Sequence, residues 1–202
     1  MSAHKHLTVV PTGYRKSTDE VKAIIGNEYL DAEVSETESQ AVRRAVDLLN
    51  SVNRGLFEKI PVQVWFTEED PYSSYEEMRR DIEENERLLI FSGGTTPPYN
   101  DHDSNLKTRA VHDYWGHYHY DVDFSFWGEF TKWASMREVY PAATHRLTFT
   151  EVVGQLSAAS QLEGGFGDPA FSQKAILAPD RWINLCFNNR PRTATVGHRA
   201  SE

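Results

Sequence analysis

The sequence has only one cysteine, Cys186, in 202 residues, so it cannot form an internal disulfide bond. This excludes the disulfide-rich secreted domains and fits a reducing compartment, with Cys186 as a buried, unreactive thiol. No apolar run reaches the ~18 residues of a membrane span. The first residues also lack the apolar core of a signal peptide. We therefore expect a cytoplasmic protein without membrane contact.

Positive charge is also scarce, because 21 lysines and arginines face 30 acidic residues, for a net charge of −9. Such a surface repels phosphate backbones, so no nucleic-acid partner is expected. The length and the 39% hydrophobic content suit a single domain over residues 1–202. Its tails, 1–12 and 188–202, lack an apolar pattern and are expected to be loosely ordered. The sequence does not indicate an oligomeric state.

Apolar periodicity predicts a mainly helical α+β fold, with a small sheet from the N-terminal half and a helical core that carries the candidate site. A capping box at 35–38, Ser-Glu-Thr-Glu, opens one helix. Further helices are expected at about 73–86, 106–119, 125–139, 149–162 and 171–177, and strands at about 60–66 and 88–92.

The most informative segment is 112–117, His-Asp-Tyr-Trp-Gly-His, because histidine is the commonest metal ligand. Two histidines and a downstream carboxylate bind the metal in mononuclear non-haem iron sites and in some zinc hydrolases. His112 and His117 would lie ~140° apart on a regular α-helix. Gly116 would have to let that helix loosen or end. Alternatively, Asp113 and His117, which share a helical face, bind without His112.

Two glutamates are candidates for the third ligand. Glu151 precedes the small apolar residues 152–154, and a buried carboxylate there needs a partner such as a metal. Glu129 is the second candidate, and it could equally be an ordinary polar residue of the helix expected at 125–139.

Nine aromatic residues lie between residues 114 and 133, and most of them must form the core. Others are expected to line a cleft beside the metal for a flat substrate or cofactor, the candidates being Tyr114, Tyr118, Phe126, Trp127 and Phe149.

The segment 112–117 resembles the His-Glu-x-x-Gly-His iron motif of the pterin-dependent aromatic amino acid hydroxylases. Leu-Thr-Phe-Thr-Glu at 147–151 resembles the segment around their third iron ligand. This resemblance implies that His112, His117 and Glu151 bind Fe(II). It also implies that Asp113, which stands where that family has glutamate, lies near a reduced pterin.

Residues 109–117, 126–129 and 150–155 also resemble an uncharacterised family in phages and actinobacteria, whose members read Arg-Ala-Val-His-Asp-Tyr-Phe-Gly-His in the first segment. This resemblance implies no activity, but it suggests that Glu129 and Gln155 belong to the same site.

Three functions fit these patterns. The first is an Fe(II) oxygenase or hydroxylase that uses dioxygen to oxidise an aromatic or amino-acid-like small molecule. A reduced pterin is a candidate second cofactor, and Asp113, Glu129 and Gln155 would have catalytic roles. The second is a zinc hydrolase with the same ligands and Asp113 or Glu129 as general base. The third is a non-enzymatic phage-type accessory domain with its histidines in a buried polar network. We take the first as the working hypothesis.

Overall fold

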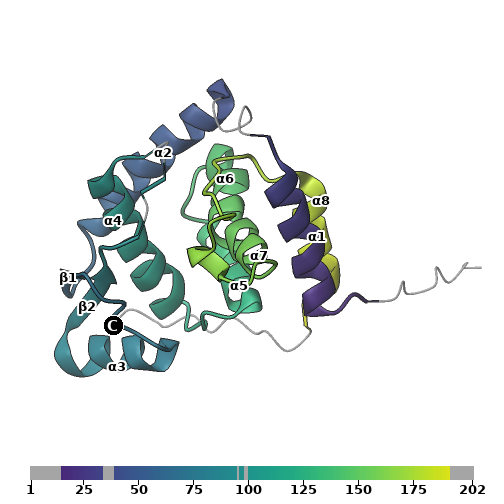
Figure 1. Ribbon diagram of the computed structural model, residues 1–202. Helices are drawn as coiled ribbons and strands as arrows, with labels where there is room; N and C mark the ends of the chain where they lie inside the picture. The colour runs from purple at the N-terminus through teal and green to yellow at the C-terminus, as the bar shows by residue number, and fades with distance from the viewer. Residues whose placement is uncertain (1–14, 34–38, 95, 98–99, 192–202) are drawn as a thin grey trace, which may run out of the picture.

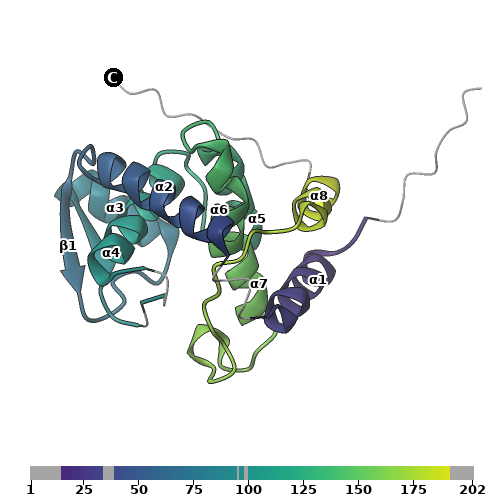
Figure 2. The same ribbon diagram turned by 90° about the horizontal axis from the view of Figure 1, so that it is seen from above.

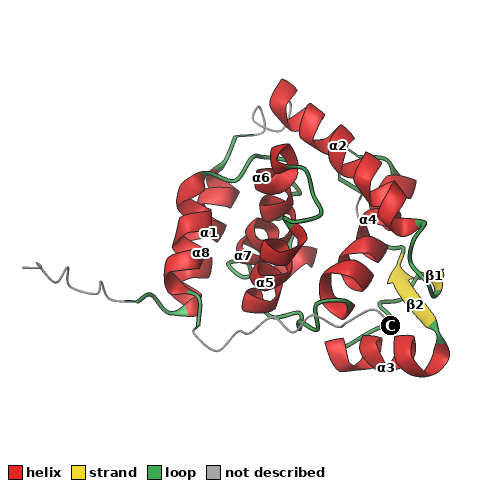
Figure 3. Cartoon of the chain, turned by 180° about the vertical axis from the view of Figure 1, so that it is seen from behind, coloured by secondary structure: helices red, strands yellow, loops and turns green. Residues whose placement is uncertain are grey.

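The computed structural model describes residues 15–33, 39–94, 96–97 and 100–191, most of which are helical (Figures 1 and 3). The α-helices are α1 (Thr18–Asp31), α2 (Gln40–Phe57), α3 (Tyr75–Asn85), α4 (His102–Val111), α5 (Phe126–Met136), α6 (His145–Phe149), α7 (Gln155–Ala159) and α8 (Asp180–Asn189). Two π-helical segments, η2 (His112–Tyr118) and η4 (Thr150–Gly154), continue α4 and join α6 to α7. Short 3₁₀ turns are η3 (Ala142–Thr144) and η5 (Gly165–Gly167).

The sheet consists of two parallel strands, β1 (Gln63–Thr67) and β2 (Arg87–Phe91), in which Val64 pairs with Leu88. Helix α3 connects them, as a parallel pair requires. Leu88 and Ile90 are buried against α3. The predicted fold class, mainly helical with a small sheet in the N-terminal half, is therefore confirmed.

The helices form three groups (Figures 1 and 2). Helices α1 and α8 lie side by side on one flank, α5, α6 and α7 occupy the middle, and α2, α4 and the sheet form the other flank. Phe130, Phe149 and Trp182 are almost completely buried in the main core, which joins the middle group to α1 and α8. The middle group thus has one face in the core and the other toward η2.

The prediction of a helix at 171–177 is wrong, because this segment is not helical. Its backbone is bonded to α1: Lys174 N donates to the Tyr29 hydroxyl at 2.7 Å, and the same hydroxyl donates to Ser172 O at 3.0 Å. The buried Lys174 Nζ also donates to carbonyl groups at the end of α1, including those of Leu30 and Ala32. These contacts replace the internal bonds of a helix.

Other expectations concern the termini and boundaries. The capping box at 35–38 and the tail at 1–12 lie outside the described residues, whereas 188 and 189, expected in a tail, belong to α8. Within the described part, α2 starts after Ser39, whose side chain accepts from Val42 N.

Cys186 is buried as predicted, and burial raises the pKa of its thiol to about 12. No described helix combines the length and apolar character needed to cross a membrane.

Candidate metal centre

A π-helix brings the two motif histidines together. In η2 the backbone bonds reach back five residues, since His119 N donates to Tyr114 O at 2.8 Å. Residues five apart then lie nearly one above the other, whereas an α-helix would separate them by ~140°. The imidazole centroids of His112 and His117 are 4.7 Å apart. The expected loosening of the helix is therefore confirmed, and it takes the form of a wider turn.

Gly116 lies where a side chain from α5 crosses the π-helix. A Cβ at this position would stand 2.5 Å from Lys132 Cδ and 2.8 Å from Lys132 Cγ. The glycine therefore leaves the space through which the Lys132 side chain reaches the site.

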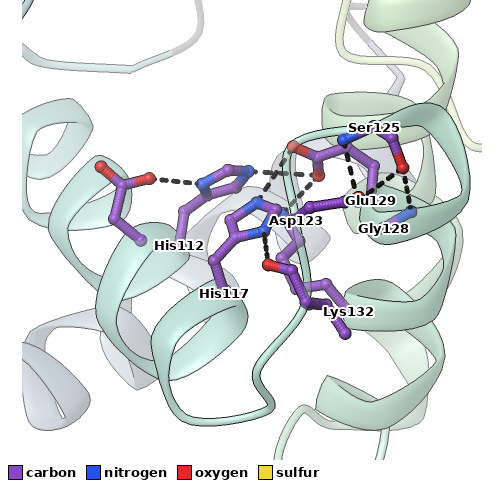
Figure 4. A network of polar contacts seen from close by, with 9 residues as sticks. His112, His117, Asp123, Ser125, Gly128, Glu129 and Lys132 are labelled. Carbon is purple, nitrogen blue, oxygen red and sulfur yellow. Dashed lines mark hydrogen bonds and ion pairs between the residues drawn. The ribbon is translucent and has the colours of Figure 1, made fainter. Parts of the chain in front are cut away.

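Glu129 is the carboxylate that meets both imidazoles. It lies in the first turn of α5, after the N-cap Ser125, where the helix dipole favours a negative charge. Its Oε1 is 3.1 Å from His117 Nε2, and its Oε2 is 3.3 Å from His112 Nε2 and 2.8 Å from Lys132 Nζ. Figure 4 shows both rings on η2 directed at this carboxylate.

The outer nitrogen of each ring is held by an acceptor. His117 Nδ1 lies 3.0 Å from the carbonyl oxygen of Val122, and His112 Nδ1 lies 2.8 Å from Asp113 Oδ1. A carbonyl or an ionised carboxylate can only accept, so both Nδ1 atoms must donate. In a neutral ring the Nε2 atom then carries a lone pair, and here that lone pair faces Glu129. Two acceptors facing each other need a proton or a metal ion between them.

The buried charges of the site influence one another. Burial by itself would raise the pKa of Glu129, but Lys132 and the two imidazoles outweigh it and hold that pKa well below its usual range. Burial lowers the pKa of His117 and of Lys132. Burial and Lys132 also act to lower the pKa of His112, but Glu129 and Asp113 outweigh them and raise it. The site therefore holds a stable anion beside a histidine, His117, whose neutral form is favoured.

These donor positions suit a metal ion. His112, His117 and Glu129 each offer an atom within 4.8 Å of the other two. Two ligands at about 2.1 Å from a metal and about 90–110° apart are separated by roughly 3.0–3.4 Å. The distances of 3.1 Å from His117 Nε2 to Glu129 Oε1 and of 3.3 Å from His112 Nε2 to Glu129 Oε2 fall in this range, each to a different oxygen of the carboxylate. Lys132 opposes a cation here, which makes its ammonium group a competitor for Glu129.

Glu151 was expected as the third ligand, but among the described residues the group that could hold a metal comprises His112, His117 and the second candidate, Glu129. The reason is packing: α5 turns Glu129 toward η2, whereas Glu151, on η4, lines the pocket beside His112. Which carboxylate binds a metal stays a prediction. Glu129 and Gln155 were expected to share a site, and both line this same pocket.

The pocket has a volume of about 540 Å³ and reaches His112, Asp113 and Glu129, whereas His117 is fully buried behind them. Its walls come from the loop before α3, β2, α4, η2, η4 and α7. Four carboxylates line it, Asp70, Asp113, Glu129 and Glu151, together with one cationic side chain, Arg109.

The aromatic residues expected around a cleft lie elsewhere. Phe149 is fully buried and Trp127 packs at the edge of the same core, where Trp127 Nε1 donates to Thr18 Oγ1. Phe126 belongs to this core too. Tyr114 and Tyr118 pack beneath the sheet. The pocket instead uses the rings of Tyr72, Phe91, Phe124 and Phe166.

Sequence reasoning missed three contributors: Lys132, Gln173 and the carbonyl of Val122. Lys132 follows Glu129 by three residues and so shares its helical face, which is a usable signal. Lysine is ordinarily exposed, however, and the pattern alone gave no reason to bury it. Gln173 comes from a segment remote in sequence.

No model of a protein family matches the chain, and no curated protein or solved structure shows significant similarity to it.

Proposed function

We propose that His112, His117 and Glu129 bind one Fe(II) ion and that the protein is a mononuclear non-haem oxygenase. The observation that carries the proposal is the orientation of the two imidazoles. Each ring has its Nδ1–H held by an oxygen acceptor and its Nε2 directed at one buried carboxylate. Histidines that bind metals are held in this way, because the outer acceptor sets the tautomer that leaves Nε2 free for the metal.

Two histidines and one carboxylate on one side of an iron ion leave coordination positions for dioxygen and substrate. Bound Fe(II) would supply the redox chemistry with dioxygen. The protein would supply the access, since His112 and Glu129 line the pocket while His117 lies behind it. Asp113 would keep the His112 ring in position. The substrate would be a small molecule that fits the pocket.

A zinc hydrolase is the second candidate, and the position of Glu151 favours it. This carboxylate lines the pocket next to His112 but is not part of the ligand group. It could therefore take a proton from a water bound to zinc, as a general base does.

Metal titration of the metal-free chain tests the shared part of both proposals. We expect one equivalent of Fe(II), added anaerobically, to raise the melting temperature. Glu129→Gln and His112→Ala should each weaken binding by at least ~10-fold, because each removes a donor. Glu151→Gln should leave metal affinity unchanged, which makes it the matched control.

The opposite pattern, with affinity lost in Glu151→Gln and kept in Glu129→Gln, would contradict the ligand set. If neither Fe(II) nor zinc changed the melting temperature, we would conclude that His112, His117 and Glu129 form a buried polar network without a metal. Oxygen uptake by the iron form, measured across aromatic and amino-acid substrates with and without a reduced pterin, supports the oxygenase. Amide hydrolysis by the zinc form, without oxygen uptake by the iron form, supports the hydrolase instead.

A further inference from the structure

The pocket beside the metal centre contains polar groups of two kinds, those already bonded and those that are not. Arg109 Nη1 donates to the carbonyl groups of Phe91 at 2.6 Å and Gly93 at 2.9 Å. The Tyr72 hydroxyl donates to Asp81 at 2.9 Å and accepts from Leu89 N at 2.9 Å. These bonds use the Nη1 atom of Arg109 and both the donor and the acceptor of the Tyr72 hydroxyl.

Two glutamine side chains of the pocket are not satisfied in this way. Gln155, on α7, is 7% exposed, and its Nε2 atom is buried without a hydrogen-bond partner among the described residues. Gln173, from the segment after η5, likewise has a buried Oε1 atom without a partner in the described part of the chain. Leaving a buried donor or acceptor unmatched costs roughly 1–3 kcal/mol, so a ligand that bonded to both amides would recover this cost.

The chemistry of these two atoms defines the ligand. An amide nitrogen needs an acceptor, and an amide oxygen needs a donor. The terminal torsion of glutamine is broad, so each amide can turn toward a ligand at little cost. A carboxamide or a lactam carries a carbonyl oxygen and an N–H next to each other and can satisfy both.

The charge and the aromatic walls of the pocket limit the class of ligand further. Four carboxylates line the described part of the pocket, Asp70, Asp113, Glu129 and Glu151, and they outnumber the lining Arg109 together with Lys132, which pairs with Glu129, so this excess of negative charge disfavours an anionic ligand. Rings of Tyr72, Phe91, Phe124 and Phe166 line the walls, and flat ligands pack well against such surfaces.

We propose that this pocket binds a neutral aromatic or heteroaromatic compound with a carboxamide or lactam edge, which Gln155 and Gln173 recognise together. The assignment of this compound as the substrate rests on the proposed function, but its binding does not require the metal.

Benzamide and benzoate are suitable probes, because they have nearly the same shape but differ in charge and in N–H donors. Their dissociation constants are measured by ligand-observed NMR or calorimetry on the metal-free chain. We expect benzamide to bind in the millimolar range or tighter and benzoate to bind at least ~10-fold more weakly. Gln155→Met and Gln173→Met should each weaken benzamide binding by ~10-fold, since each removes one hydrogen bond.

Gln161→Met is the matched control, because Gln161 Nε2 already donates to Ser160 Oγ at 2.9 Å and the residue does not line the pocket. It should leave benzamide affinity unchanged. Thermal melts add a readout that does not depend on a ligand. Gln155→Met should keep or raise the melting temperature, because it replaces an unmatched buried amide by an apolar chain.

Three results would overturn the proposal: no benzamide binding at millimolar concentration, benzoate binding as tight as benzamide, or full affinity in both glutamine variants. A lower melting temperature in Gln155→Met with unchanged benzamide affinity would show that Gln155 has a structural role only. All of these measurements use metal-free protein. A negative benzamide result would therefore not contradict metal binding, and a negative metal titration would not contradict benzamide binding.

Discussion

At the scale of single residues, Glu129 determines the chemistry of the site. Its two carboxylate oxygens face two imidazole nitrogens and one ammonium group, and of these partners His117 and Lys132 are buried while His112 is partly exposed at the pocket. A buried charge is tolerated only when it is compensated, and here Lys132 is the permanent partner. A metal ion at the imidazoles would share that role, so Lys132 both stabilises the metal-free protein and competes with the metal.

Lys132→Met tests this dual role. Without its ion pair the buried Glu129 carboxylate is less well compensated, so the metal-free variant should lose ~3–5 kcal/mol of unfolding free energy. Saturating Fe(II) or zinc should then raise its melting temperature by more than it raises that of the wild type. Thermal melts with and without metal measure both effects.

The control for this variant is Lys107→Met, since Lys107 pairs with the exposed Asp103 one helical turn away. It should change stability by no more than ~0.5 kcal/mol, with or without metal. An equal metal effect in Lys132→Met and the wild type would contradict the competition.

At the scale of elements, the π-helix η2 and helix α5 form the site together. The wider turn brings the ring centroids of His112 and His117 within 4.7 Å, and the absence of a side chain at Gly116 lets Lys132 cross to Glu129. The candidate ligands are thus divided between the two elements, with both histidines on η2 and Glu129 on α5. On the opposite flank, Glu28 of α1 accepts from Arg181 and Trp182 of α8 and ties these two helices together.

Gly116→Ala should disturb the contact between η2 and α5. The new methyl group would overlap Lys132 Cδ and Cγ, whose position is set by the ion pair at Nζ. We expect a loss of ~1–3 kcal/mol, as for other overpacked cores, and weaker metal binding, both measurable by denaturation and titration.

Gly55→Ala in α2 is the comparison, since a Cβ there meets nothing within 4 Å. It should stabilise the protein by ~0.5–1 kcal/mol, as alanine does in a helix interior. If both alanine variants behaved alike, the close approach at Gly116 would be of no consequence.

Glu28 gives a pH-dependent prediction. The hydrogen bond from Arg181 holds the pKa of Glu28 below its usual value, against the opposing effect of burial. A carboxyl with a lowered pKa in the folded state adds stability above its unfolded pKa and loses it as the pH falls through the folded pKa. Wild type should therefore exceed Glu28→Gln in unfolding free energy by ~0.5–1 kcal/mol near pH 7, after allowance for partial exposure, and this difference should disappear as the pH falls through the lowered pKa of Glu28.

Chemical denaturation across this pH range measures the difference. Glu163→Gln, at an exposed position, is the control and should track the wild type throughout. A Glu28→Gln difference that persists at the lowest pH would show that packing, not charge, links α1 to α8.

At the scale of the whole molecule, the main core and the pocket use different aromatic residues. Phe149 is fully buried in the main core and contacts the ring of Trp133 on α5 with their centroids 4.9 Å apart. Phe166 is 56% exposed and lines the pocket. Stability and ligand binding should therefore respond to different substitutions.

Phe149→Ala should lose ~3–5 kcal/mol of unfolding free energy. Its metal affinity, measured at a temperature well below its melting point, should equal that of the wild type. Phe166→Ala should change stability by less than ~1 kcal/mol and weaken benzamide binding. Denaturation and titration of both variants measure this division. If the folded Phe149→Ala variant lost metal affinity, Phe149 would instead be needed for metal binding.

Local sequence was sufficient for features that one segment decides alone. The strands, the charged helix α3 and the histidine motif follow from periodicity, caps and spacing within a few residues. The buried state of Cys186 follows from its apolar neighbours. The segment at 171–177 failed as a helix because its hydrogen-bond partners, such as Tyr29, lie far away in sequence.

The apolar periodicity by itself determined that this is a mainly helical protein, and the histidine spacing singled out one candidate metal-binding segment. Only the tertiary structure decided which carboxylate lies between the two imidazoles, that a lysine is buried beside that carboxylate, and which rings line the pocket. The physical reason is that Glu129 and Glu151 lie on different helices, and their chemistry as isolated residues is the same. The packing of α5 against η2 brings one of them to the imidazoles and leaves the other in the pocket wall.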